Sequence, residues 1–278
     1  MKVGIVGLGL IGGSFAKAYQ EAGHEVLAFD RDESVLSFAQ LEGAVSAPLT
    51  KENIGTCDLV LVAIYPEAAV NYVRDMAPYI GTKPMVIDCC GTKRVVCEAC
   101  FPLAEQYRFT YLGGHPMAGT QYSGFGHARA NLYHNAPMVI VPPAFDNIEL
   151  LSRVQELLRP AGFGSYSVTT AEKHDEMIAF LSQLTHCIAV TLMCCNNMPD
   201  LEYYTGDSFR DLTRIARIND EMWSELFLDN KDMLLAEMRS FKQSFEELYE
   251  KIETGDRDRI REMMRLSTER RKRFNKHL

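Results

Sequence analysis

The 278-residue chain is 47% hydrophobic and 24% charged, so it is long enough to bury two hydrophobic cores and does not have the composition of a disordered protein. Its formal net charge of −8 argues against a general binder of nucleic acids or anionic membranes, because both surfaces are negatively charged. The first strand is predicted directly after Met1 and Lys2, which leaves no room for a signal peptide, and we expect no apolar run that approaches the length needed to span a bilayer. We therefore expect a cytoplasmic protein without membrane contact.

The stretch 3–14, VGIVGLGLIGGS, is typical of a buried strand that enters a helix through a glycine turn. Its glycines follow the G-x-G-x-x-G pattern, which permits a tight turn, a close approach of the backbone to a pyrophosphate, and close packing of the helix on the strand. The N-terminus of the helix would offer free N–H groups to the phosphates. We expect a dinucleotide to contact this loop at Gly7, Gly9, Leu10, Ile11 and Gly12.

An acidic residue stands where such a fold binds the ribose of the cofactor. Asp30 follows the predicted strand 25–29 and lies 23 positions after Gly7, near the offset of roughly 20 residues expected for that carboxylate. A carboxylate there accepts hydrogen bonds from ribose hydroxyls and repels a ribose phosphate, which favours NAD over NADP, although the adjacent Arg31 keeps NADP open. The alternative is a glycine turn in another α/β protein, with Asp30 as a helix cap.

The following segments alternate between apolar strands and amphipathic helices. Predicted strands cover residues 57–64, 83–88, 109–112, 137–141 and 163–168, and predicted helices cover 32–41, 66–76, 91–104 and 146–158. This alternation predicts a parallel, doubly wound, Rossmann-like sheet. Ligands bind beyond the carboxyl ends of such strands, so we expect Tyr65 and Pro66 beside the cofactor and His115 near its reactive end. An imidazole there can accept a proton near neutral pH, as alcohol oxidation requires.

From residue 170 onward almost every segment has helical periodicity, so we expect two domains, 1–169 and 170–278, the second entirely helical. In the predicted helix 230–252, apolar residues keep three- and four-residue spacing for about five turns: Met233, Leu234, Met238, Phe241, Phe245, Leu248 and Ile252. Such a stripe is covered either by other helices of the same domain or by a second copy of the chain. We expect a homodimer.

The eight cysteines raise the question of a metal site, because Cys97 and Cys100 have the spacing of half a zinc site. Cys89 and Cys90 are adjacent, would point to opposite faces of a strand, and do not repeat that spacing. We therefore expect free thiols in a reducing compartment and no bound metal.

Three further segments carry distinctive motifs: GGHPMAGT at 113–120 followed by Ser123-Gly124, SQLTH at 182–186 preceded by His174-Asp175, and FRDLTRIA at 209–216 followed by Met222-Trp223 and LFLDN at 226–230. They resemble, respectively, the catalytic loop, the second histidine helix and the substrate-arginine segment of prephenate and arogenate dehydrogenases, the tyrosine-pathway enzymes. The resemblance covers essentially the whole chain in the family's order.

The resemblance implies an NAD-dependent oxidative decarboxylation of a cyclohexadiene that carries a ring hydroxyl and, across the ring, a carboxylate. His115 would accept the hydroxyl proton, and Arg214 would bind the ring carboxylate with a planar guanidinium that never loses its charge. The other implied substrate contacts are His186, Thr120, Gln121 and Trp223. Without the resemblance, His186 would be interpreted as a hydrogen-bonded core residue and Arg214 as a surface or ion-paired arginine.

Two positions depart from the family pattern. Gly91 stands where many members carry a serine that hydrogen-bonds the catalytic histidine, so Thr92, one residue along, is the expected catalytic hydroxyl if the loop is shifted. Gln121 is neutral where some relatives are acidic, and because it offers no charge to an ammonium group, we favour prephenate, giving 4-hydroxyphenylpyruvate, over arogenate. Three alternatives stay open: an arogenate dehydrogenase giving tyrosine directly, another β-hydroxyacid or imine oxidoreductase, and a non-catalytic NAD(H)-binding regulator.

Overall fold

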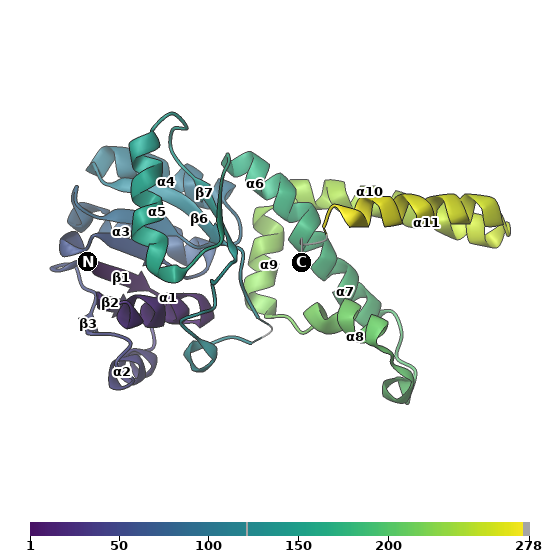
Figure 1. The fold of residues 1–278 in the computed structure, drawn as a ribbon, viewed down its shortest axis with the longest axis horizontal. Helices are drawn as coiled ribbons and strands as arrows, with labels where there is room; N and C mark the ends of the chain where they lie inside the picture. The colour runs from purple at the N-terminus through teal and green to yellow at the C-terminus, as the bar shows by residue number, and fades with distance from the viewer. Residues whose placement is uncertain (121, 275–278) are drawn as a thin grey trace. The chain divides into compact units, whose positions relative to one another are not determined.

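The computed structural model describes residues 1–120 and 122–274 and separates into two compact units, the first being Met1–Asn230. The first unit contains an eight-stranded sheet in the order β3-β2-β1-β4-β5-β6-β7-β8 (Figure 1). Its strands are β1 (Lys2–Val6), β2 (Glu25–Phe29), β3 (Ala47–Pro48), β4 (Leu59–Val62), β5 (Met85–Asp88), β6 (Thr110–Pro116), β7 (Pro137–Val141) and β8 (Ser165–Val168). All neighbours from β3 to β6 pair in parallel, which confirms the predicted Rossmann-like sheet.

The sheet departs from the prediction at one pair, because β6 and β7 are antiparallel. The described part of the chain between them, residues 117–120 and 122–136, contains a short 3-10 turn at Phe125–His127 and no crossover α-helix. Without a crossover the chain returns beside β6 in the opposite direction, as hairpin-type connections do. This arrangement leaves residues 117–120 and 122–124 beyond the carboxyl end of β6, shortly after His115.

Helices cover both faces of the sheet. Residues of α1 (Leu10–Glu21), α2 (Glu33–Leu41) and α5 (Ile148–Leu158) belong to one hydrophobic core, and residues of α3 (Pro66–Ile80) and α4 (Arg94–Tyr107) belong to another. Side chains of β4 alternate between the cores, with Leu59 and Leu61 in the first and Val60 and Val62 in the second. A strand buried on both faces is continuously apolar for this reason.

The turn between β1 and α1 depends on its glycines. Gly7 has φ of +86°, in the region that only glycine adopts readily. A Cβ atom on Gly12 would lie 1.8 Å from the carbonyl oxygen of Gly7, so only a hydrogen fits there. A Cβ atom on Gly9, the N-cap of α1, would meet nothing within 4 Å, and no side chain caps this helix. The N-terminus of α1 thus combines open space beside Gly9 with backbone N–H groups that no side chain caps.

The first unit also contains the helices that follow the sheet. They are α6 (Ala171–Ile178), the π-helical turn Ala179–Leu184, α7 (Thr185–Cys194), α8 (Asp207–Thr213) and α9 (Asp220–Asp229). Residues 171–194 are thus helical throughout, and the helix widens in the middle, at the π-helical turn. By packing, these helices belong to the same compact unit as the sheet, and the predicted domain boundary after residue 169 stays a prediction.

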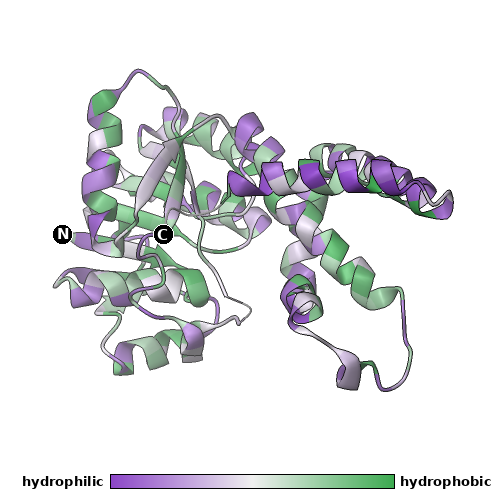
Figure 2. Ribbon diagram, turned by 45° about the vertical axis from the view of Figure 1, so that its right-hand side comes forward, coloured by the Kyte–Doolittle hydropathy of each residue, from purple (hydrophilic) through white to green (hydrophobic). Residues whose placement is uncertain are grey.

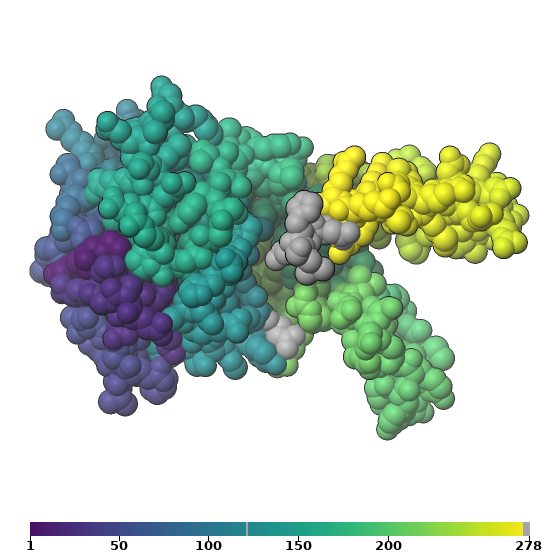
Figure 3. All heavy atoms as spheres, in the orientation of Figure 1, coloured from purple at the N-terminus to yellow at the C-terminus, as the bar shows by residue number. Residues whose placement is uncertain are grey.

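The second unit begins at Lys231 and contains α10 (Lys231–Glu253) and α11 (Arg257–Lys272). The two helices pack against each other as a hairpin joined by Gly255, which has φ of +67° (Figure 3). Helix α11 is hydrophilic along most of its length (Figure 2). Much of the predicted apolar stripe on α10 is exposed within this unit, and its most exposed members are Phe245 and Ile252, both 61% exposed.

The helix Ala171–Cys194 is long and apolar enough to cross a membrane by length and composition alone, with a mean hydropathy of 1.7 over its most apolar window. The expectation that no stretch reaches this length is wrong, because uncharged residues such as Ser182 and Thr185 interrupt the apolar run without lowering its mean hydropathy far. In the fold this helix carries buried, hydrogen-bonded polar side chains, as interior helices of folded domains do. Its exposed apolar side chains are Met177, Phe180, Leu181 and Met193.

We expect the substitution Gly12→Ala to destabilise the fold by at least about 2 kcal/mol, because the added methyl group would force the β1–α1 turn open. The melting temperature followed by circular dichroism should fall by several degrees. Gly9→Ala is the matched control: it makes the same change in the same loop but meets no neighbouring atom, so it should melt close to the wild type. Equal melting temperatures for the two variants would contradict this account of the turn.

Candidate active site

A cavity of about 870 Å³ opens at the carboxyl ends of β1, β4, β5 and β6. The strand order reverses between β1 and β4: β2 and β3 follow β1 on one side, and β4, β5 and β6 continue on the other. Doubly wound sheets bind their ligands at such a switch point. The sheet side is lined by Gly9, Leu10, Ile11, residues 63–66, residues 89–91 and His115. The helical side is lined by residues of α6 to α9, among them Ser182, Gln183, His186, Arg214, Trp223 and Leu226.

Most of the predicted site residues meet at this cavity. Lining it are Gly9, Leu10, Ile11, Tyr65, Pro66, His115, Thr120, His186, Arg214 and Trp223. Gly7 and Gly12 shape the glycine turn beneath it, whereas Asp30, Arg31 and Thr92 are not among its lining residues. Gln121 lies outside the described residues. A smaller pocket of about 450 Å³ shares Thr120 and Arg214 with this cavity and adds Arg129.

Asp30 holds the glycine loop from the end of β2. One carboxylate oxygen accepts a hydrogen bond from the amide of Leu8 at 2.6 Å, and the other accepts from the amide of Asp32 at 2.9 Å. The carboxylate is therefore fixed next to the loop, at the side where the ribose of a dinucleotide on that loop is expected. The helix-cap function that the sequence also allowed belongs to Asp32, which accepts from the amide of Ser34.

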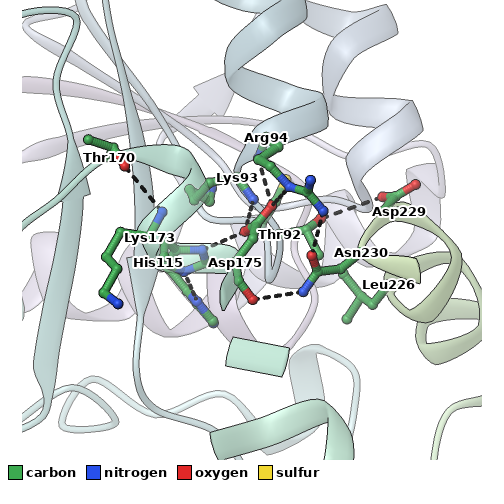
Figure 4. Close-up of polar contacts among 12 residues, drawn as sticks. Thr92, Lys93, Arg94, His115, Thr170, Lys173, Asp175, Leu226, Asp229 and Asn230 are labelled. Carbon is green, nitrogen blue, oxygen red and sulfur yellow. Dashed lines mark hydrogen bonds and ion pairs between the residues drawn. The ribbon is translucent and has the colours of Figure 1, made fainter. Parts of the chain in front are cut away.

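His115 lies on β6, half-buried, and faces the cavity (Figure 4). Its Nδ1 lies 2.9 Å from Nε2 of His174, and Nδ1 of His174 lies 2.7 Å from Oδ1 of Asp175. Burial, and then the neighbouring His174 and Lys93, hold the pKa of His115 well below its usual value. The ring is therefore neutral near pH 7 and has a lone pair with which to accept a proton.

Asp175 anchors this row of side chains at the N-terminus of α4. It is fully buried and accepts hydrogen bonds from the amides of Lys93 and Arg94, at 2.8 and 2.9 Å, and from Nε of Arg94 at 3.3 Å. Burial pushes the pKa of Asp175 upward, but the hydrogen bonds from His174 and from the amide of Arg94 outweigh it and leave the pKa below its ordinary value. A helix N-terminus stabilises the negative charge further.

A second buried ion pair lies beside β6, the strand that carries His115. The ammonium of Lys93 contacts Oδ1 of Asp88 and donates to the carbonyl of Gly114 at 2.6 Å, while the hydroxyl of Tyr111 donates to the other oxygen of Asp88 at 2.7 Å. Burial disfavours the ammonium, but Asp88 outweighs it and raises the pKa of Lys93. The lysine thus holds the backbone one residue before His115.

Gly114 permits this close packing, because a Cβ atom there would lie 2.5 Å from the carbonyl oxygen of Asp88. The same constraint applies to Gly113, where a Cβ atom would lie 2.6 Å from the sulfur of Cys97. The glycine pair before His115 therefore serves to bring β6 against the buried lysine, in addition to any role in the loop.

The assignment of a catalytic hydroxyl to Thr92 is not supported by the geometry. Its side chain is buried and its Oγ1 donates to Oδ2 of Asp229, at 3.5 Å, on the side away from His115 (Figure 4). The loop is not shifted in the way this assignment requires. Gly91 lines the cavity, but a Cβ atom there would lie 3.2 Å from both terminal methyl groups of Leu226. A leucine side chain thus packs against the position where relatives are expected to carry serine.

The helical wall of the cavity combines an arginine with a paired imidazole and indole. His186 donates from Nδ1 to the carbonyl of Ser182 at 2.9 Å, and its ring centroid lies 3.7 Å from that of Trp223. Burial chiefly, and the charge of Arg214 in addition, lower the pKa of His186. Arg214 itself makes no ion pair or hydrogen bond with other described residues, so its guanidinium is available to an anion.

A network of amide side chains ties the helices of this wall together. Gln183 donates to the carbonyl of Leu226 at 2.7 Å. Asn230 donates to the oxygen of Gln183 at 2.9 Å and to the carbonyl of Asp175 at 2.8 Å, and it accepts from Arg94 at 2.8 Å. The network connects α4, α6 and α9. Asp175, which supports His115 through His174, therefore also helps to position the helical wall.

Sequence reasoning missed the supporting residues Lys93, His174 and Asp175. The only available signal was the adjacent His174-Asp175 pair, which the sequence places 59 residues after His115. Nothing in local periodicity indicates that the start of α6 packs on the end of β6. Lys93 carried no signal, because a lysine before a helix is normally exposed.

The cysteines lie mainly in the apolar core. Cys97 and Cys100 are buried on α4, and burial raises the pKa of the Cys100 thiol to about 12. All eight cysteines carry free thiols. Within residues 1–120 and 122–274, no three His, Cys, Asp or Glu side chains are grouped so that they could hold a metal ion.

The glycine turn at the switch point, together with a neutral histidine in the adjoining cavity, defines a Rossmann-fold, dinucleotide-dependent oxidoreductase. Two family models match the chain: the nucleotide-binding domain of prephenate dehydrogenase over residues 15–166 and the dimerization domain of prephenate dehydrogenase over residues 170–266. The chain belongs to the prephenate dehydrogenase family, and the resemblance found in the sequence is confirmed.

Individual relatives agree with this family. Prephenate dehydrogenase of Lactococcus lactis subsp. cremoris is 28% identical over 270 residues, which cover 93% of this chain and 73% of that one. Cyclohexadienyl dehydrogenase of Zymomonas mobilis subsp. mobilis is 28% identical over 273 residues, 94% and 91% of the two chains. Prephenate dehydrogenase from A. aeolicus, solved with hydroxyphenyl propionate and NAD+, superposes with a TM-score of 0.86 at 25% identity over 99% of this chain and 98% of that one.

We expect the substitution Lys93→Met to destabilise the protein by about 3–5 kcal/mol, because it leaves the Asp88 carboxylate buried without its cation. Adding Asp88→Asn should recover much of that loss, since an amide needs no counter-charge and still accepts from Tyr111 or from the amide of Cys90. Urea unfolding of the two single variants and the double variant measures the coupling. Additive free energies would show that the two groups are independent.

Proposed function

We propose that this chain is an NAD-dependent prephenate dehydrogenase, which converts prephenate to 4-hydroxyphenylpyruvate and carbon dioxide in tyrosine biosynthesis. The observation that carries the proposal is the position of His115, a neutral imidazole that lines the same cavity as the glycine turn and Arg214. In the reaction, the ring hydroxyl gives up its proton and the carbon that carries it gives up a hydride. The bond to the carboxylate across the ring then breaks to release carbon dioxide, the electron pair of that bond makes the ring aromatic, and the phenol oxygen takes a proton back.

The residues of the glycine turn fit NAD. Space for a pyrophosphate exists beside Gly9, the first amides of α1 are uncapped, and Asp30 is held next to the loop where it can accept from ribose hydroxyls. We assign Gly7, Gly9, Leu10, Ile11 and Gly12 to the phosphate side, Asp30 and Arg31 to the ribose side, and Tyr65 and Pro66 to the wall beside them. When bound, NAD supplies the nicotinamide ring that takes up the hydride.

The side chains of this protein account for proton removal and substrate orientation. His115 accepts the hydroxyl proton, because its ring is neutral and faces the cavity. Arg214 holds the ring carboxylate until it leaves, as a guanidinium on the cavity wall with no ion-pair partner among the described residues can do. His186, Trp223 and Thr120 form the wall around the ring. Gln121 lies outside the described residues and stays a prediction from the sequence, and Thr92 is left out of the site.

We further propose that the chain is a homodimer in the cytoplasm. Several apolar side chains are exposed in a single copy, among them Phe245 and Ile252 of α10 and Phe180 and Leu181 of the helix Ala171–Cys194. Both segments fall within the part of the chain matched by the dimerization-domain model. A second copy would remove this apolar surface from water. The negative net charge and the buried polar network on Ala171–Cys194 support a folded, cytoplasmic protein over a membrane-spanning one.

The activity is tested by the rise in absorbance of the reduced nicotinamide, with NAD or NADP as cofactor and with prephenate or arogenate as substrate. We expect turnover with NAD and prephenate, and because the pKa of His115 is lowered, kcat/KM should fall on the acid side only well below pH 6.5.

His115→Asn should lower kcat by roughly 10²–10⁴-fold. Arg214→Leu should raise KM by roughly 10- to 100-fold, as expected for a charge-assisted pair.

Arg210→Leu is the matched control for Arg214, since Arg210 is on the same helical segment but pairs with Asp207 on the surface. It should keep wild-type kinetics. Turnover with arogenate alone would assign the alternative substrate. Cofactor binding without turnover in any combination would favour a non-catalytic regulator or an oxidoreductase for another substrate.

The dimer is tested by light scattering coupled to gel filtration. We expect twice the 31.4 kDa mass of the chain at micromolar concentration, and a single-chain mass for the double variant Phe245→Glu/Ile252→Glu, which places charges in the exposed stripe of α10. Gln243→Glu, on the opposite side of α10, should remain dimeric. A single-chain mass for the wild type, or binding of the chain to lipid vesicles, would overturn the assignment of these apolar faces.

A further inference from the structure

Asp175, His174 and His115 form a row of three side chains that ends at the cavity. We infer that Asp175, acting through His174, keeps a proton on Nδ1 of His115 and so leaves Nε2 as the atom that accepts the substrate proton. Asp175 and His174 are then positioning residues for the reaction proposed above, on which this inference rests.

The direction of the row is set at Asp175. Its carboxylate already accepts from two backbone amides and from the guanidinium of Arg94, and an ionised carboxylate has no proton to donate. At the 2.7 Å contact with His174, the hydrogen must therefore belong to Nδ1 of the histidine. The carboxylate selects the tautomer of His174 in which Nδ1 carries the proton.

The second contact follows from the first. His174 is buried, and burial lowers its pKa, so its ring is neutral and carries only one proton. With that proton on Nδ1, Nε2 of His174 is a lone pair that can only accept. The 2.9 Å contact with His115 therefore requires that Nδ1 of His115 donates. The positive charge of nearby Lys93 also disfavours a second proton on either ring.

The row ends at the reactive atom. In a neutral imidazole, a proton on Nδ1 leaves Nε2 as a lone pair on the opposite side of the ring. Nε2 of His115 has no hydrogen-bond partner in the part of the chain that the structure describes, and the residue lines the cavity. When Nε2 takes up the substrate proton, the resulting positive charge is stabilised by the lone pair of His174 and, behind it, by the charge of Asp175.

This row also explains how His115 is held without a neighbouring hydroxyl. Gly91 has no side chain, Leu226 packs against it, and Thr92 faces Asp229. No hydroxyl from residues 91 and 92 therefore supports the ring of His115. His174 provides the hydrogen bond from α6, across the end of β6, so that the support comes from the helical wall of the cavity instead of from the loop after β5.

The tautomer is read directly by nuclear magnetic resonance of the free protein labelled with ¹⁵N-histidine, in which protonated and unprotonated ring nitrogens have well-separated shifts. The His115→Asn and His174→Gln spectra assign the two residues among the seven histidines. We expect both rings to carry their proton on Nδ1. In His174→Leu, which removes the acceptor, the proton of His115 should move largely to Nε2. In His174→Gln, whose side-chain oxygen can accept, it should return to Nδ1.

Kinetics provide the second readout. His174→Leu should lower kcat by about 10- to 100-fold with little change in KM, within the 10²–10⁴-fold that a general base contributes in total, and His174→Gln should recover part of it. His24→Gln, an exposed histidine that contacts the N-terminus, is the control and should match the wild type in every measurement. A purely structural role would change the melting temperature of both His174 variants without moving the proton on His115.

Two results would overturn the inference: a proton on Nε2 of His115 in the wild type, or an unchanged His115 spectrum in a folded His174→Leu variant. Because the spectra need no substrate or cofactor, they decide the tautomer even if the protein fails to oxidise prephenate. Failure of the proposed function and failure of this inference are thus separate outcomes.

Discussion

The site depends on one buried carboxylate. Asp175 receives two amides at the start of α4, the guanidinium of Arg94 and the ring of His174, and its own carbonyl accepts from Asn230. A carboxylate removed from water is stable only when such donors surround it. The elements that supply the donors are thereby fixed around Asp175, and they are the same elements that form the walls of the cavity.

Below this carboxylate lies a second paired charge, Lys93 with Asp88, which is fully buried against β5 and β6. The two ion pairs form a polar layer between the apolar core of the sheet and the cavity. Buried pairs add little net stability, because desolvation offsets their attraction, but removing one partner is costly. In this protein the layer holds the backbone carbonyl before His115 and the ring of His115 itself. Its contribution is therefore to the position of His115 and not to net stability.

The cavity places a neutral base and a charged arginine within reach of one ligand. His115 is neutral because it is buried beside Lys93 and His174, whereas Arg214 stays charged on the more exposed helical wall. A base and a permanent cation on opposite walls suit a substrate with a hydroxyl to deprotonate and a carboxylate to hold. Leu226 packs against Gly91 on the same cavity, and a Cβ atom on Gly91 would lie 3.2 Å from both of its terminal methyl groups.

The sequence by itself determined the local parts of this protein: the glycine turn, the order of strands and helices, and the residues His115, His186 and Arg214, because turn geometry and periodicity act over a few positions and the motifs carry the family resemblance. The tertiary structure decided what lies beside them. The antiparallel β7, the burial of Lys93, the direction of Thr92 and the contact of His115 with His174 all join residues far apart in the chain, where backbone spacing places no constraint and only packing selects the partner.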